Sequence, residues 1–193
     1  MIPFATLDMR LPVSPTLWAT DATPSTGGAA ACRVPLCVAE ELGKHAETRG
    51  AYARLNHAED FDTTRRLLPR DDGVREVVLR LPWNALSQYS FRDIHNANLQ
   101  ESRAVKHELR RLVSTTYTSG RYQVVLCDSL VSVCAWSKGR SSSFRLNGLL
   151  RSSLPYLVIA NIMLDLVWID THANPGDPPL ARPAVDDSCA SSQ

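Results

Sequence analysis

Four acidic residues stand at the ends of predicted secondary-structure elements: Asp21, Glu101, Asp128 and Asp177. Asp21 and Asp128 each close a predicted strand, and Glu101 lies in the first turn of the clearest predicted helix. Open α/β folds keep their sites where the carboxyl ends of neighbouring strands meet, at one edge of the sheet. We therefore expect the four carboxylates to converge at that edge.

Carboxylates gathered at one point repel one another, and divalent cations relieve that repulsion. Hard oxygen ligands without His or Cys favour Mg²⁺ or Mn²⁺ over zinc. Two such ions about 4 Å apart can activate a water molecule and stabilise the leaving oxygen of a phosphodiester. The acidic cluster therefore predicts metal-dependent phosphodiester hydrolysis.

Each acid also has a simpler interpretation when it is taken alone. Asp128 could cap the helix predicted after it, and Glu101 could be the capping-box partner of Asn98, three residues earlier. Asp177 stands before two prolines, which is typical of a turn. Only the joint occurrence of the four acids favours a metal site.

Five predicted strands position the acids, over residues 16–22, 29–34, 87–94, 122–127 and 163–169. Helices are predicted within 35–55, from Asn98 onward, over 129–139 and over 141–162, with a short one at most in 170–183. The Pro and two glycines of residues 23–28 indicate a turn between the first two strands. Pro155 is expected to kink or divide the long helix that contains it. This order predicts an α/β fold with a mixed sheet, part antiparallel and part parallel, flanked by helices.

The helix from Asn98 carries apolar residues at helical spacing, among them Val105, Leu109 and Leu112. Glu101 lies one turn before Val105, so it is predicted to face the sheet with them.

Composition excludes several classes of protein. The 193 residues carry a formal net charge of +1, which is too small for a strongly basic nucleic-acid coat. No run approaches 18 apolar residues and no secretory signal stands at the N-terminus, so we expect a soluble, intracellular protein with no membrane partner. The five cysteines form no C-x-x-C pair, so we interpret them as reduced and structural. The charge is uneven, because residues 137–151 contain four basic residues and no acidic one.

Several stretches resemble ribonuclease H domains of retroelement reverse transcriptases. "CDSLVSVCAWSKG" is similar to the family's T-D-S-x-x-V strand and helix, and "NLQESRAVKHEL" resembles its N-x-x-E-L-x-A helix start. "LWATDATPSTGGAA" resembles the first hairpin with its leading Asp, and "VWIDTHANPGDPPLARP" the W-V-P-x-x-x-N-x-x-D-x-x-S-R ending. The resemblance covers about residues 16–183, with an insertion near 36–86. It implies a five-stranded ribonuclease H-like sheet, the first three strands antiparallel and the rest parallel, within residues 15–185, after a leader over 1–14 and before a disordered tail over 186–193.

The resemblance also implies functional roles. The four acids would hold two Mg²⁺ or Mn²⁺ ions, with Asp21 bridging both, Glu101 near the leaving oxygen and Asp177 near the attacking water. His172 stands in the loop where many members carry a mobile His that assists proton transfer or product release, although a satisfied surface His is an equal alternative. Contacts to the nucleic-acid backbone would come from residues of the helix starts and the basic segment: Asn98, Ser129, Lys138, Arg140, Ser141 and Arg145.

The activity so implied is cleavage of the RNA strand of RNA–DNA hybrids, in the cytoplasm or nucleus, with a reverse-transcriptase polymerase domain as a partner. Three alternatives stay open: a non-catalytic module that binds hybrid or a polymerase, a DNA nuclease or transposase of the same fold, and a regulatory α/β domain without a nucleic-acid role. The segment of residues 45–72 resembles no substrate-binding element.

Overall fold

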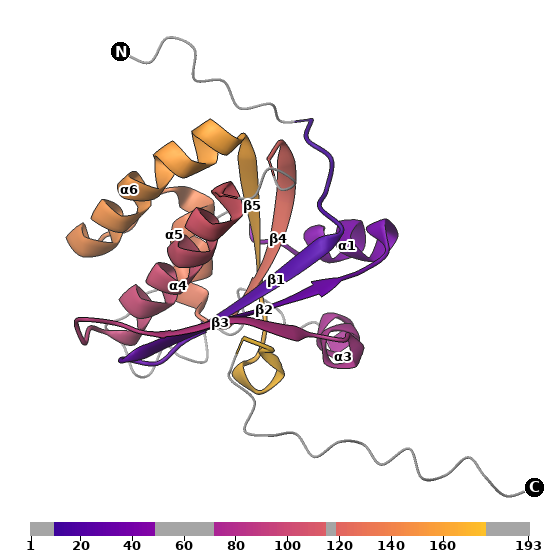
Figure 1. Cartoon of the computed structure of the whole chain (residues 1–193), viewed down its shortest axis with the longest axis horizontal. Coiled ribbons are helices and arrows are strands. Elements are labelled where there is room, and N and C mark those ends of the chain that lie inside the picture. Colours follow the sequence, from indigo (N-terminus) through magenta and orange to yellow (C-terminus); the bar gives the residue numbers. More distant parts are fainter. Residues whose placement is uncertain (1–9, 49–71, 115–118, 177–193) are drawn as a thin grey trace, which may run out of the picture.

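A computed structural model describes residues 10–48, 72–114 and 119–176. Its centre is a five-stranded sheet with the strand order β3-β2-β1-β4-β5 (Figure 1). Strand β1 (Thr16–Ala22) pairs antiparallel with β2 (Thr26–Arg33), and β2 pairs antiparallel with β3 (Asn84–Ser90). On its other side β1 pairs parallel with β4 (Arg121–Cys127), which pairs parallel with β5 (Ile162–Trp168). The predicted mixed sheet is therefore confirmed, and it is consistent with a ribonuclease H-like fold.

Helices cover both faces of the sheet (Figure 1). Helix α4 (Ala97–Val113), helix α5 (Leu130–Lys138) and helix α6 (Phe144–Ala160) lie on one face. Helix α1 (Leu36–Gly43) and helix α3 (Asp72–Arg80), both within the predicted insertion, lie on the other. Within the described segments, no helix combines the length and the apolar character that a membrane span needs.

The period-two alternation of the strands divides the core into two layers. Leu17 and Leu126 are buried among residues of α1 and α3, whereas Trp18 and Val125 are buried against α4. Cys127 belongs to the α4 layer as well. Both faces of β4 are thus covered, which explains why its sequence is a nearly continuous apolar run.

The first hairpin differs from its prediction. Gly27 and Gly28 belong to β2 and not to the turn. The turn is closed by Thr23, whose Oγ1 accepts a 2.9 Å hydrogen bond from the Thr26 backbone N–H. A Cβ on Gly27 would come within 2.7 Å of the Tyr89 ring, so this glycine allows close packing of β2 on β3.

Strand β3 and helix α6 also correct the predictions. Strand β3 begins and ends earlier than residues 87–94, and Ile94, which the alternation placed in the strand, is 74% exposed in the following loop. Pro155 lies inside helix α6 without dividing it. Because Pro155 is exposed, water can satisfy the carbonyl that loses its helical hydrogen bond.

Candidate metal centre and basic pocket

The parallel pairing of β1 with β4 brings Asp21 and Asp128 to one edge of the sheet. The last paired position joins Thr20 to Cys127, and each of these residues directly precedes one of the two acids. Because the two strands run parallel and side by side, Asp21 and Asp128 lie near each other, as expected for acids at the ends of neighbouring strands. Asp128 does not cap helix α5, because Ser129 is the N-cap and its Oγ accepts a 3.3 Å hydrogen bond from Ser132 N–H.

Glu101 reaches the same edge from helix α4. The N-cap of this helix is Asn96, whose side chain accepts a 2.9 Å hydrogen bond from Asn98 N–H, so the predicted start at Asn98 and its capping box with Glu101 are wrong. The Oε1 atom of Glu101 instead accepts a 3.1 Å hydrogen bond from the backbone N–H of Ala22. Glu101 is only 6% exposed and faces the sheet, as the apolar spacing of the helix predicted.

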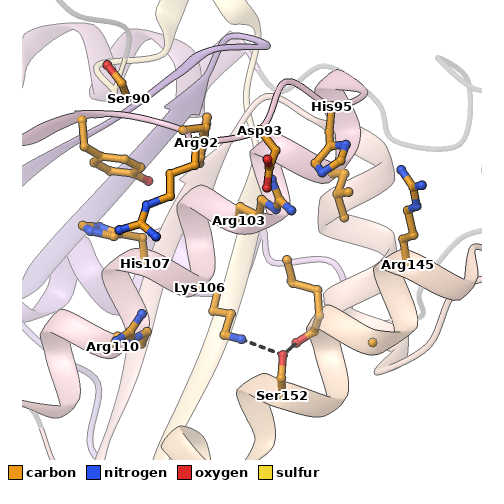
Figure 2. A pocket seen from close by; sticks show the side chains of 15 residues that line it. Ser90, Arg92, Asp93, His95, Arg103, Lys106, His107, Arg110, Arg145 and Ser152 are labelled. Carbon is orange, nitrogen blue, oxygen red and sulfur yellow. Dashed lines mark hydrogen bonds between the residues drawn. The ribbon is translucent and has the colours of Figure 1, made fainter.

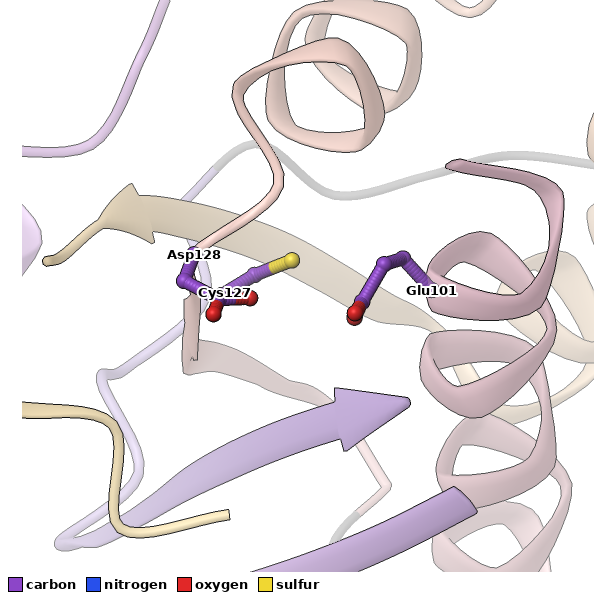
Figure 3. Close-up of side chains that lie close together, drawn as sticks. All are labelled: Glu101, Cys127 and Asp128. Carbon is purple, nitrogen blue, oxygen red and sulfur yellow. The ribbon is translucent and has the colours of Figure 1, made fainter. Parts of the chain in front are cut away.

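Glu101, Cys127 and Asp128 could together hold a metal ion (Figure 3). One carboxylate oxygen from each acid and the Cys127 Sγ all lie within 4.8 Å of one another. The Oε2 atom of Glu101 is buried and has no hydrogen-bond partner among the described residues. Buried polar atoms are normally satisfied, so an unpartnered carboxylate oxygen in an acidic cluster is a position that a cation would complete.

The electrostatics of the cluster match that interpretation. Burial raises the pKa of Glu101 to about 9, and the negative charges of Asp128 and Asp21 act in the same direction. Burial also raises the pKa of the Cys127 thiol, with further contributions from Glu101 and Asp128. Glu101 and Cys127 therefore resist ionisation beside the other two acids, and a divalent cation is what would make the charged forms of Glu101 and Cys127 favourable.

The segment after β5 packs against Asp21. Asn174 is buried, and its Nδ2 donates to the Thr20 carbonyl oxygen at 3.0 Å and to Asp21 Oδ1 at 3.5 Å. A Cβ on Gly176 would come within 2.7 Å of the Thr20 carbonyl carbon, so only glycine fits here without a shift. Asp177 follows Gly176 in the sequence and lies outside the described residues.

His172 lies in the short 3₁₀ helix η3 (Thr171–Ala173), within the loop where only a short helix was predicted. Its side chain is exposed, and its backbone N–H donates to Asp170 Oδ1 at 2.9 Å. This placement is compatible with both interpretations of His172, the functional and the ordinary surface residue.

The predicted nucleic-acid contacts fall into two groups. Asn98 and Ser129 lie together where α4 and α5 begin, since Ser129 Oγ donates to Asn98 Oδ1 at 3.4 Å. Ser141 precedes helix α6, and its backbone N–H donates to Asn147 Oδ1 at 2.7 Å. Lys138 closes helix α5, and Arg140 is exposed just after it. Arg145, on the first turn of α6, is the member of this set that lines a large pocket.

That pocket, of about 880 Å³, lies between α4, α6 and the loop after β3 (Figure 2). Its cationic lining residues are Arg92, Arg103, Lys106, Arg110 and Arg145, and we call this group the basic pocket. Asp93 is the acid among the lining residues that the structure describes. Lys106 spans the two helices by donating a 2.6 Å hydrogen bond to Ser152 Oγ (Figure 2).

Sequence reasoning missed most of the basic pocket and the position of Cys127. Arg103, Lys106 and Arg110 recur at steps of three and four residues, which puts them on one face of α4, opposite Glu101 and the core. This helical spacing is the feature of the sequence that indicates a basic face on α4. Cys127 was interpreted as structural because it ends an apolar run.

Comparison with known proteins does not assign the chain to a family. No protein-family model matches the chain, and no curated protein matches its sequence.

Proposed function

We propose that this chain is a metal-dependent endoribonuclease that cleaves the RNA strand of RNA–DNA hybrids, as the ribonuclease H part of a retroelement polyprotein. The observation that carries the proposal is the meeting of Glu101 with Asp128 where β1 and β4 end, next to Asp21. The sheet order and the sequence resemblance favour this chemistry over that of an unrelated α/β domain.

The residues present fit Mg²⁺ or Mn²⁺. Carboxylate oxygens are the ligands these ions prefer, and the unpartnered Oε2 atom of Glu101 supplies one that nothing else among the described residues uses. Asp21, Glu101, Asp128 and Asp177 would hold two ions. When bound, such ions activate water and stabilise the leaving oxygen of a phosphodiester.

The protein itself would fix the ligands before metal arrives. The hydrogen bond from Ala22 N–H holds one oxygen of Glu101, and Asn174 donates to Asp21 Oδ1. Both contacts restrict the rotamers of these acids, so less ordering of their side chains would be needed when a metal ion binds. The site would therefore be largely preformed.

Binding of the hybrid would use the basic pocket. Helix α4 carries Glu101 on its sheet-facing side and Lys106 and Arg110 on the pocket side, so one helix would link cleavage and backbone binding. Phosphate contacts give affinity with little dependence on sequence, whereas the 2′-hydroxyls in the wide minor groove distinguish the RNA strand. An intracellular location and a polymerase domain as partner belong to the same proposal.

A substrate comparison tests the proposal. Labelled RNA–DNA hybrid, duplex DNA and duplex RNA are each incubated with the full chain, in Mg²⁺ or Mn²⁺ and in chelator. We expect cleavage of the RNA strand of the hybrid alone, only with metal, leaving 3′-hydroxyl and 5′-phosphate ends. Cutting of duplex DNA instead would favour a DNA nuclease or transposase.

A second candidate is a non-catalytic module that binds hybrid or a polymerase. The basic pocket favours it independently of the acids, because its cations would bind phosphates whether or not the metal centre works. Hybrid binding without metal-dependent cleavage would support this candidate.

A further inference from the structure

Cys127 places a thiol inside the candidate metal centre. Its register partner is Thr20 on β1, and its Sγ lies within 4.8 Å of oxygens of Glu101 and Asp128. In Figure 3 the sulfur atom points towards Glu101. Magnesium and manganese sites are built from oxygen, so the sulfur is not explained by the proposed nuclease reaction.

Two buried polar atoms around this thiol lack partners. Glu101 is 6% exposed, and its Oε2 has no hydrogen-bond partner within the described part of the chain. Thr20 is fully buried on the strand beside Cys127, and its Oγ1 also has no hydrogen-bond partner among the residues that the structure describes. Unsatisfied buried oxygens are rare in folded proteins, and a bound ion or ordered water is one way in which they become satisfied.

We propose that the candidate metal centre has a second, thiophilic mode, in which one Zn²⁺ ion binds Cys127 Sγ and one carboxylate oxygen each of Glu101 and Asp128. Binding forms one Zn–S bond and two Zn–O bonds, and it releases the thiol proton of Cys127 and the carboxyl proton of Glu101 to solvent. The inference deepens the proposed function, because this ion would use two of the acids that the nuclease needs and would inhibit it.

The geometry suits zinc after a small adjustment. Zn–S bonds of about 2.3 Å and Zn–O bonds of about 2.0 Å in a tetrahedron set the ligand atoms about 3.5 Å apart. The three ligand atoms already lie within 4.8 Å of one another. Asp128 is only partly buried, so its side chain has room to close the difference. Three protein ligands leave a fourth position for water.

The mixed ligand set also explains selectivity. A thiolate binds borderline and soft ions such as Zn²⁺ and Cd²⁺ strongly and contributes little to Mg²⁺. Replacing sulfur by oxygen should therefore weaken the zinc mode while leaving the oxygen ligands in place. Serine is the variant that makes this change with the smallest loss of volume.

Cadmium titration of the full chain in magnesium-free buffer tests the site without any assay of activity. We expect a thiolate-to-cadmium charge-transfer absorption band that Zn²⁺ displaces. The band should be lost in Cys127→Ser and weakened in Glu101→Gln. It should persist in two matched controls, Cys134→Ser for a buried thiol and Cys37→Ser for an exposed one.

X-ray absorption at the zinc edge of the wild-type protein gives a readout that does not depend on whether a variant folds. One sulfur at about 2.3 Å with oxygen neighbours is expected. A band unchanged in Cys127→Ser, or a zinc shell without sulfur, would overturn the inference. Both measurements are independent of cleavage, so the zinc site can stand if the nuclease proposal fails. If the nuclease is active, the ratio of rates with and without zinc should be closer to one in Cys127→Ser.

Discussion

The Oε1 atom of Glu101 accepts a 3.1 Å hydrogen bond from the backbone N–H of Ala22, the residue that follows Asp21. This contact joins residues 79 positions apart and ties helix α4 to the end of strand β1. It satisfies one carboxylate oxygen and leaves the other, Oε2, buried without a partner among the described residues. Glu101 is therefore fixed in place in a site that disfavours its charge unless a cation is present.

The first prediction concerns the pH dependence of stability in chelator. The pKa of Glu101 is raised from 4.5 to about 9 on folding, mainly by burial, so the folded protein binds this proton more tightly than the unfolded chain does. The contribution of Glu101 is fully present below about pH 4.5 and is lost as the pH rises towards 9. One such proton changes the free energy of unfolding by about 1.4 kcal/mol per pH unit in that window. Glu101→Gln, which cannot ionise, should flatten the slope measured by denaturant unfolding.

Glu41→Gln is the control for this measurement. Glu41 is an exposed acid of helix α1 that pairs with Lys44, and its pKa is lowered by that partner. Its replacement should leave the slope unchanged. An equal slope in Glu101→Gln and the wild type would show that Glu101 is ionised in the metal-free protein.

The second prediction is that Asp128→Asn, and separately Asp21→Asn, abolishes cleavage of a labelled hybrid at saturating Mg²⁺ while hybrid binding stays measurable. An amide keeps the shape of the side chain but removes the negative charge that a divalent ion needs. Asp165→Asn is the matched control, because Asp165 is a partly buried acid on the neighbouring strand β5 and pairs with Val124, away from the strand ends. Retained cleavage in Asp128→Asn or Asp21→Asn would show that the replaced acid is not required for the reaction.

How far the sequence could predict the fold differs from strand to strand. β1 and β4 were predicted to within one residue because their apolar runs and flanking polar residues mark them. The predicted start of β2 is too late because its "TGGAAACR" sequence contains two glycines, which are typical of turns. Gly27 is needed for close packing against Tyr89 of strand β3, and the local sequence does not show that contact. The sequence analysis predicts no helix where α3 lies, although Val74 and Val78 are buried one turn apart.

Of the candidate site, the sequence could predict the acids but not the position of Cys127 or the basic pocket. Asp21 and Asp128 follow neighbouring parallel strands, so the order of elements alone brings them together. The position of Cys127 requires knowing which face of β4 meets α4, and a strand buried on both faces carries no such signal. The basic pocket requires the packing of α6 on α4, which no local pattern encodes.

The third prediction concerns the basic pocket. Lys106→Ala should weaken hybrid binding and make it less sensitive to salt, because each phosphate contact adds roughly 0.9 to the slope of log affinity against log salt for a duplex. Lys44→Ala is the control, since Lys44 follows helix α1 on the opposite face of the sheet (Figure 1). Fluorescence anisotropy over a series of salt concentrations measures both variants. Equal slopes for Lys106→Ala and the wild type would exclude Lys106 from the binding surface.

The fourth prediction concerns Gly176, the last described residue before Asp177. A Cβ there would meet backbone atoms of Thr20 and Asp21 at 2.7–3.0 Å, and backbone cannot swing aside as a flexible side chain can. Gly176→Ala should therefore cost about 1–3 kcal/mol of stability or push this segment off strand β1. Gly148→Ala is the control for stability alone, because a Cβ there meets no atom within 4 Å and alanine should stabilise helix α6 by up to about 1 kcal/mol. If Asp177 acts with Asp21, Gly176→Ala should also reduce the rate of hybrid cleavage, by more than its loss of stability explains. Additional Mg²⁺ should then partly restore the cleavage rate. Unchanged stability and unchanged cleavage in Gly176→Ala would show that the close approach of this segment to Asp21 is not required.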